Sequence, residues 1–233
     1  MHPKNGYRIV VGMATMAGRE TQCANALASI MEQTLPADEV YLYNNATARV
    51  DLTDNGKFYG LTFETEPCYY LTCDDDIIYP VSYIADMVAA LDSFASGCIV
   101  THHGRILGPP CPTYYRNPLS RFYAFTDPLR AATRLDVAGT GVSAFRTDHI
   151  NPVSIVTDPR HKMTDLLISE LAAMQGVRII AIPRKTGYLR VQFISPDQTI
   201  FGGQHKADHV QAEIANRIYL TNKRKEHEQV HRA

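Results

Sequence analysis

Residues 69–80 have the sequence YYLTCDDDIIYP, in which an apolar, strand-like run leads directly into three consecutive aspartates. Adjacent carboxylates repel one another, so a cluster at the end of a strand needs either open water or a cation. Alternate side chains share one face of a strand, which predicts Asp74 and Asp76 on one side and Asp75 on the other. An Asp-x-Asp pair of hard oxygens suits Mg²⁺ or Mn²⁺ carrying a diphosphate. The alternative is a solvated acidic turn at the start of the following helix.

The flanking sequence alternates between strand-like and helix-like patterns, which is typical of helices that cover a mainly parallel sheet. We therefore predict an α/β fold with strands at residues 7–12, 39–43, 69–73, 98–101, 137–146 and 177–183. Helices are expected near residues 23–31, 83–94, 163–174 and 207–220. Residues 104–136 interrupt the pattern with glycines and prolines among aromatic residues and arginines. A long irregular insertion of this kind is usually functional or mobile.

The composition is that of an ordinary globular protein, with 45% hydrophobic and 20% charged residues in a chain of 233. This length suits one large domain with a real core. The net charge of -1 provides no overall field to attract nucleic acid or an anionic membrane. Basic residues near the end of the chain are typical of a solvated helix end, and only occasionally of a contact with a polyanion. They are Arg217, Lys223, Arg224, Lys225 and Arg232.

The cysteines and the apolar segments bear on the cellular compartment. The five cysteines are odd in number, form no Cys-x-x-Cys pair and lie mostly in apolar segments. This pattern predicts reduced thiols, with neither a disulfide framework nor a zinc site. The N-terminal residues lack the apolar region of a signal peptide, and no apolar stretch is long enough to span a bilayer. We therefore expect a cytoplasmic protein without a transmembrane segment.

The order of these features resembles the GT-A fold of nucleotide-sugar-dependent glycosyltransferases, close to the family 2 type. The resemblance runs from Arg8 to the last helix, and the acidic triplet, which contains the Asp-x-Asp pattern, is its sharpest signature. Four further segments support it by their position and order. They are the loop after the first strand (13–20), the turn DNGKF (54–58), the glycine-rich strand GTGVSAF (139–145) and the segment MTD (163–165).

The resemblance implies a Rossmann-like, mixed and mainly parallel sheet flanked by helices. It implies one catalytic domain over residues 1–233, with an irregular aromatic-rich insertion. Within this domain, residues 1–100 are expected to form the nucleotide-binding half and residues 101–206 the acceptor-side half. Residues 207–233 are expected to form a C-terminal helix and basic tail.

The resemblance also implies which residues bind the metal and the donor. Mn²⁺ or Mg²⁺ is expected on Asp74, Asp76 and a histidine late in the chain, His205. The donor is expected to be a nucleoside-diphosphate sugar, with uridine as the nucleoside. Its contacts are expected at Thr15, Arg19, Asn44, Asp54, Lys57, Asp74 and Asp75. For several of these a simpler interpretation stays open, because charged residues at helix starts and aspartates or asparagines in turns often serve only the local backbone.

The reaction implied by the resemblance needs a proton acceptor. An acceptor hydroxyl is a poor nucleophile at neutral pH, so an inverting enzyme uses a carboxylate to take its proton. Asp165 is our candidate for this base, and the alternative is an acid that only interacts with the helix dipole. The aromatic insertion is expected to bind an acceptor glycan, with a lid over the donor or a subunit contact as alternatives.

Three other functions stay open from the sequence. The chain could glycosylate a modified base in DNA, which the basic tail supports and the overall charge does not. It could be a nucleotidyltransferase, although no glycine-rich arginine-lysine signature follows the first strand. It could also be a non-catalytic protein that binds nucleotide sugars, which the joint presence of the acidic triplet and Asp165 disfavours.

Overall fold

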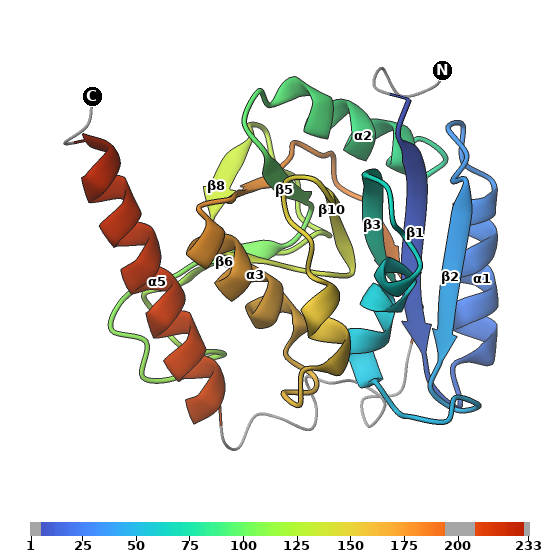
Figure 1. The fold of residues 1–233 in the computed structure, drawn as a ribbon, viewed down its shortest axis with the longest axis horizontal. Coiled ribbons are helices and arrows are strands. Elements are labelled where there is room, and N and C mark those ends of the chain that lie inside the picture. The colour runs from blue at the N-terminus through green and yellow to red at the C-terminus, as the bar shows by residue number, and fades with distance from the viewer. Residues whose placement is uncertain (1–5, 194–207, 231–233) are drawn as a thin grey trace.

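A seven-stranded sheet forms the centre of the molecule, and helices cover both of its faces (Figure 1). The computed structural model describes residues 6–193 and 208–230. The strand order in the sheet is β2-β1-β3-β10-β5-β11-β8. In chain order the strands are β1 (Arg8–Thr15), β2 (Glu39–Asn44), β3 (Cys68–Asp74), β5 (Cys98–Thr101), β8 (Thr133–Leu135), β10 (Val142–Arg146) and β11 (Arg178–Ala181).

Five of the seven strands run in the same direction. Strands β2, β1 and β3 are parallel neighbours, and β5 is parallel to β11. Strand β10 is antiparallel to both β3 and β5, and β8 is antiparallel to β11. The structure thus confirms the expected α/β fold with a mainly parallel sheet and is compatible with a Rossmann-like arrangement. Because β10 lies between two strands from residues 1–100, the two predicted halves of the chain share one sheet.

Alternating side chains divide the core into two layers. On one face, Ile9, Val11 and Met13 of β1 pack with α1 (Glu20–Met31) and α2 (Tyr83–Ser93). On the other face, Val10 belongs to the layer beneath the remaining helical elements. These elements are the 3-10 helices η1 (Thr53–Thr62) and η2 (Val153–Thr157) and the helix α3 (Thr164–Gln175).

The residues around Asp54 form a 3-10 helix, η1, rather than the simple turn that the sequence suggested. This helix lies directly on β1, because a Cβ atom at Gly12 would overlap the carbonyl oxygen of Lys57. The hydroxyl of Tyr70 on β3 donates to the same carbonyl at 2.9 Å. The missing side chain of Gly12 therefore brings Lys57 against the sheet, close to the end of β3.

The insertion at residues 104–136 contains more regular structure than the sequence predicted. A small sheet is formed by β6 (Gly104–Ile106), β7 (Arg121–Tyr123) and β9 (Val137–Ala138), and β8 joins the edge of the central sheet. These strands are two or three residues long, too short to show an alternating pattern. A third sheet pairs β4 (Ile77–Ile78), just after the acidic triplet, with β12 (Arg190–Val191).

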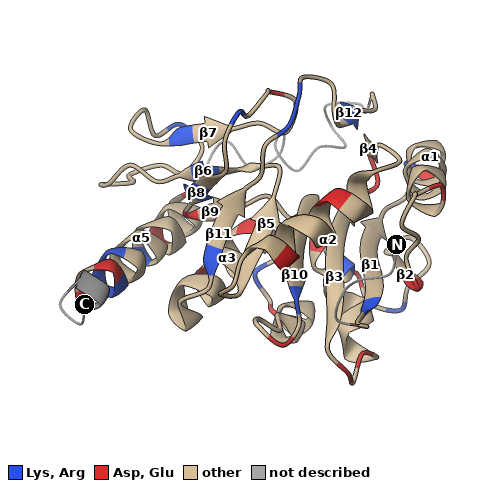
Figure 2. Cartoon of the chain, turned by 90° about the horizontal axis from the view of Figure 1, so that it is seen from above, with Lys and Arg blue, Asp and Glu red and all other residues tan. Residues whose placement is uncertain are grey.

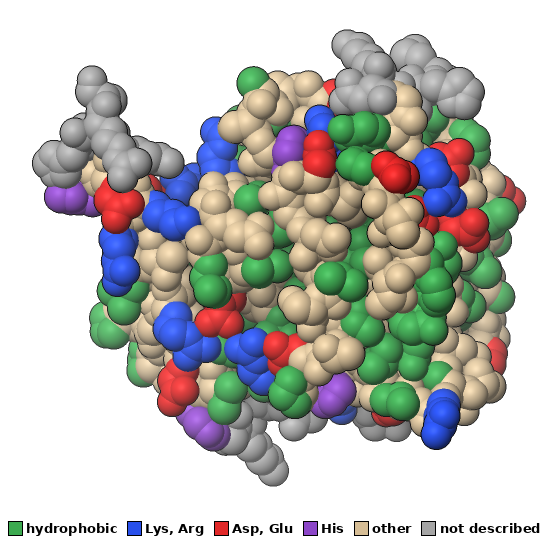
Figure 3. All heavy atoms as spheres, viewed as in Figure 1, with side chains coloured by type: hydrophobic (Ala, Val, Ile, Leu, Met, Phe, Trp, Pro, Cys, Tyr) green, Lys and Arg blue, Asp and Glu red, His purple; other side chains and the backbone are tan. Residues whose placement is uncertain are grey.

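Helix α5 (His209–Val230) packs against α3 in a separate apolar cluster that includes Ile214 and Ile218. Charges of both signs follow one another along this helix (Figure 2), and both signs also appear on the face of the molecule shown in Figure 3. Arg217 Nε donates to Glu170 Oε1 at 2.8 Å, and Lys223 Nζ donates to Glu226 Oε2 at 2.7 Å. Two of the basic residues, Arg217 and Lys223, are thus paired with acidic residues of the protein itself.

Two other expectations concern the cysteines and the membrane. All five cysteines are buried and unpaired, as the sequence predicted. Among the helices of the described residues, none has the length and apolar character needed to cross a membrane.

Candidate functional site

A pocket of about 600 Å³ opens where β1 and β3 end. The carboxyl ends of parallel strands meet at one edge of a sheet, and ligands of α/β proteins bind in the crevice outside that edge. The pocket wall includes all three aspartates of the triplet and most of the other residues selected from the sequence. These are Thr15, Arg19, Asp54, Lys57, Asp74, Asp75, Asp76 and Asp165.

The three aspartates do not follow the strand alternation that the sequence predicted. Strand β3 ends at Asp74, and Asp75 and Asp76 lie in a turn. Because the turn reorients the backbone, all three residues line the same pocket, and the predicted separation of Asp75 from the other two is wrong. Asp75 is only 3% exposed and accepts hydrogen bonds from Thr15 Oγ1 at 2.7 Å and from Arg19 Nη1 at 2.6 Å. Thr15 and Arg19 thus hold the triplet from the end of β1.

Asp74 is paired with Lys57, whose ammonium group donates to Asp74 Oδ1. Burial by itself lowers the pKa of Lys57, but the charges of Asp74 and Asp54 outweigh burial and raise the pKa above its usual value. Lys57 therefore stays protonated although it is buried. Gly141 makes room for this pair, because a Cβ atom there would overlap the carboxylate of Asp74. This glycine of the segment GTGVSAF thus accommodates a carboxylate of the protein itself.

Asp76 is the least compensated member of the triplet. Its nearest cation is Arg19, with 3.7 Å between Nη1 and Asp76 Oδ2. Burial, followed by the negative charges of Asp74 and Asp75, raises the pKa of Asp76 to about 6. Among the described residues, the three carboxylates are paired with two cations, Arg19 and Lys57. This excess of negative charge fits a site that receives a further cation.

The described residues supply only part of a metal site. They contain no group of three histidines, cysteines or acidic residues placed to hold a metal ion. Asp74 and Asp76 both line the pocket, whereas the predicted third ligand, His205, lies outside the described residues. Carboxylate oxygens are suitable ligands for Mg²⁺ or Mn²⁺, and the remaining positions are commonly filled by water and by substrate phosphates.

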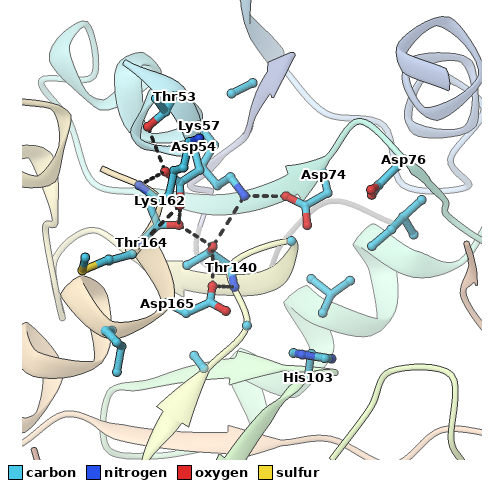
Figure 4. Close-up of a pocket in the computed structure, with 18 of the residues that line it drawn as sticks. Thr53, Asp54, Lys57, Asp74, Asp76, His103, Thr140, Lys162, Thr164 and Asp165 are labelled. Atoms are coloured by element: carbon cyan, nitrogen blue, oxygen red, sulfur yellow. Dashed lines mark hydrogen bonds and ion pairs between the residues drawn. The ribbon is translucent and has the colours of Figure 1, made fainter. Parts of the chain in front are cut away.

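Asp165 lies in the first turn of α3 and is fixed by a single residue of the glycine-rich segment (Figure 4). Its Oδ1 atom accepts hydrogen bonds from the backbone N–H and from the hydroxyl of Thr140, both at 2.7 Å. No hydrogen bond to Oδ2 occurs within residues 6–193 and 208–230. One oxygen is therefore anchored and the other remains able to accept a proton from a ligand in the pocket.

The carboxylate of Asp54 accepts hydrogen bonds from residues at the start of α3 (Figure 4). Its Oδ1 accepts the backbone N–H of Lys162 at 2.8 Å, and its Oδ2 accepts the hydroxyl of Thr164 at 2.6 Å. The Thr164 hydroxyl lies 3.1 Å from that of Thr140, which lies 3.5 Å from Lys57 Nζ. Asp54 therefore ties η1 to α3 and helps to position Asp165, and a chain of polar contacts connects Asp165 with Lys57 and the triplet.

The two adjacent asparagines at the end of β2, Asn44 and Asn45, have different surroundings. Asn44 does not line the pocket, and its Oδ1 accepts the backbone N–H of Ala46 at 3.0 Å, as in a local turn. Asn45 does line the pocket, and its side-chain amide donates to the carbonyl oxygens of Thr15 and Thr53. The expected donor contact was Asn44, with a turn as the alternative, whereas its neighbour Asn45 is the asparagine that lines the pocket.

Two pocket residues, His103 and Arg105, were not selected from the sequence. Both residues come shortly after the end of β5, just as the triplet lies at the end of β3. Because ligands bind outside the carboxyl ends of the strands, this position in the sequence could have identified them. His103 Nδ1 accepts the backbone N–H of Phe125 at 3.3 Å. Burial lowers the pKa of His103, with Asp165 opposing this shift and Arg105 adding to it, which favours the neutral imidazole. A Cβ atom at Gly139 would overlap this ring.

Comparison of the sequence with protein-family models and with curated proteins finds no match.

Proposed function

We propose that the protein is a metal-dependent glycosyltransferase of the GT-A type. It transfers a sugar from a nucleoside-diphosphate sugar, with uridine diphosphate as the leaving group, to a hydroxyl group of an acceptor glycan. The observation that carries the proposal is the presence in one pocket of the acidic triplet at the end of β3 and of Asp165, a carboxylate with one anchored oxygen. A pocket at the carboxyl edge of a mainly parallel sheet supports it further.

Charged side chains line the donor side of the pocket. Asp74 and Asp76 would hold the divalent cation, and Arg19 would keep the triplet in place through Asp75. Bound Mg²⁺ or Mn²⁺ supplies electrostatic stabilisation of the negative charge on the departing diphosphate. Lys57 stays protonated beside Asp74 and adds a fixed positive charge in this half of the pocket.

The acceptor side of the pocket is built around Asp165. The acceptor oxygen forms a bond to the anomeric carbon while the bond from that carbon to the diphosphate oxygen breaks. The diphosphate leaves with the bonding electrons, and the acceptor proton passes to Asp165 Oδ2. Thr140 holds Oδ1 with two hydrogen bonds, so Asp165 is oriented before the substrate arrives. Attack from the face opposite the leaving group inverts the anomeric configuration.

The proposal is tested by thermal unfolding with a panel of nucleotide sugars, each with and without Mn²⁺. A ligand that binds only the folded protein raises its melting temperature. We expect a stabilising nucleotide sugar whose effect needs Mn²⁺ and is lost in Asp76→Asn. Glu66→Gln, which removes an exposed carboxylate remote from the pocket, serves as the control and keeps the effect.

Two results contradict the proposal. One is the absence of stabilisation by every nucleotide sugar in the panel. The other is release of pyrophosphate from a nucleoside triphosphate, which indicates a nucleotidyltransferase instead. Retention of the anomeric configuration in the product contradicts the role of Asp165 as the base of a direct displacement.

A further inference from the structure

On one side of the pocket, which we call the aromatic half, three aromatic side chains surround Arg105. They are Tyr114, Tyr115 and Phe122. Arg105, on β6, has its guanidinium carbon 4.2 Å from the ring centre of Tyr114, 5.1 Å from that of Phe122 and 5.8 Å from that of Tyr115. All four residues line the pocket. Rings at these distances attract the cation and restrict its motion, so the guanidinium is held in place before a ligand binds.

The positive charge of Arg105 has no counter-ion in the described structure. Its Nη1 donates to the carbonyl oxygen of Tyr114 at 2.8 Å, and this is the only side-chain hydrogen bond of Arg105 within residues 6–193 and 208–230. No carboxylate of the same residues lies within 4.0 Å of it. Two other cations of the pocket, the partly buried Arg19 and the buried Lys57, are both paired with aspartates. A guanidinium has five N–H donors, so most of those on Arg105 are available to a ligand.

A chain of contacts connects Asp165 with Arg105 along the pocket wall. Thr140, which anchors Asp165, follows Gly139, whose backbone lies against the ring of His103. The ring of Phe122 then lies between His103 and Arg105, with its centre 4.8 Å from that of the His103 ring and 5.1 Å from the Arg105 guanidinium carbon. Asp165, Arg105 and the aromatic rings line one pocket, so a molecule that presents a hydroxyl group to Asp165 has the aromatic half beside it.

We propose that this aromatic half of the pocket binds an anionic group of the acceptor, a carboxylate or a phosphate, and that Arg105 is the residue that recognises it. The assignment of this ligand as the acceptor rests on the function proposed above. The planar fork of a guanidinium matches the two oxygens of a carboxylate or phosphate, and such paired hydrogen bonds are stronger than neutral ones. The substrate class is then an acidic saccharide or a sugar phosphate.

The structure offers a matched control in Arg121. This arginine lies on β7, which pairs directly with β6, and its guanidinium carbon is 5.0 Å from the ring centre of Tyr123. It is exposed and does not line the pocket. Arg121→Met therefore removes an equivalent charge and ring contact from the same small sheet without changing the proposed subsite.

The test is a binding titration, followed by ligand-observed NMR, of Arg105→Met, Arg105→Lys, Arg121→Met and the unaltered protein. The probes are methyl glucuronide, glucose 6-phosphate and the neutral methyl glucoside. We expect at least one anionic probe to bind the unaltered protein and Arg121→Met more tightly than the neutral probe does. Arg105→Met should weaken that binding by roughly tenfold to a hundredfold, as for the loss of a charged hydrogen bond. Arg105→Lys should retain part of it, because lysine keeps the charge and loses the fork.

The two anionic probes distinguish a carboxylate from a phosphate ligand. Equal binding of anionic and neutral probes overturns the proposal, as does unchanged binding in Arg105→Met. Inorganic phosphate that competes at the same concentration as the sugar anions also overturns it, because the site then shows no selection for a saccharide. If Arg105→Met does not fold, unchanged affinity and selectivity in Arg105→Lys overturns the specific role of the guanidinium.

Binding of UDP-sugars with Mn²⁺ is measured on the same preparations. If the protein binds glucuronide or sugar phosphate but no UDP-sugar, the glycosyltransferase proposal is wrong and the anion subsite stands. If it binds a UDP-sugar with Mn²⁺ but neither anionic probe, only the subsite proposal is wrong.

Discussion

Replacing Thr140 with valine tests whether its hydroxyl anchors Asp165. Valine has nearly the same shape and keeps the backbone N–H, so the substitution removes only the hydroxyl and its hydrogen bonds. The main loss is the 2.7 Å donation to Asp165 Oδ1, a hydrogen bond to a charged acceptor in a buried residue. Such a bond contributes about 1.5–3 kcal/mol, and the lower end applies because the backbone N–H still binds the same oxygen.

We expect Thr140→Val to lower the free energy of unfolding by about 1.5 kcal/mol. In a chain of this size, that corresponds to a decrease in melting temperature of roughly 3–6 °C. Transfer should slow because Asp165 is less firmly oriented, with little change in donor binding. Thr140→Ser, which keeps the hydroxyl and loses a methyl group worth about 0.8 kcal/mol, is the control for the loss of volume and should keep the transfer rate.

A double-mutant cycle with Asp165→Ala separates the contact from unrelated effects. Urea denaturation of the unaltered protein, both single variants and the double variant gives the coupling energy between the two side chains. We expect a coupling of about 1.5 kcal/mol, equal to the lost hydrogen bond. Additivity within about 0.5 kcal/mol refutes the reasoning, because it shows that the hydroxyl does not stabilise Asp165.

Three further predictions follow from the same structure. Asp165→Asn keeps an oxygen for Thr140 but cannot accept the proton, so single-turnover transfer should slow by ~10²–10⁴-fold with donor binding retained; near-normal transfer eliminates the base assignment. Gly141→Ala should displace the Asp74 carboxylate and destabilise the protein by about 1–3 kcal/mol, measured by urea denaturation; an unchanged midpoint contradicts the tight contact. Burial lowers the pKa of His102 to about 3, and neither ring nitrogen has a hydrogen-bond partner among the described residues. An unfolded histidine binds a proton below about pH 6.5, so this residue costs stability progressively as the pH falls from that value toward 3. His102→Leu should flatten the pH dependence of stability in this window by up to about 1.4 kcal/mol per pH unit, and an unaltered slope contradicts the prediction.

The sequence was sufficient where a local pattern has one physical solution. Apolar runs and helical spacing located the main strands and helices of the first 100 residues, because these elements are long enough for their periodicity to appear. It also located the acidic triplet at the end of a strand and Asp165 at the start of a helix. The triplet reached the pocket because strand ends of a mainly parallel sheet meet at one edge. Asp165 reached it because its carboxylate binds Thr140, just before β10, the antiparallel neighbour of β3.

Other features of the site depend on contacts between residues far apart in the chain. Asp54 and Lys57 looked like turn residues, yet one is engaged at the start of α3 and the other is paired with Asp74. Residues 104–136 had no periodicity to reveal the short strands that carry Arg105 into the pocket.

The alternation rule failed at Asp75 because β3 ends one residue earlier, and a turn then places all three carboxylates on one wall. The sequence by itself therefore determined which residue types stand at the strand ends. Only the tertiary structure decided which of their charges have an opposite charge at hydrogen-bond distance and which, as at Asp76 and Arg105, have none among the described residues, because that depends on where distant backbone segments pack.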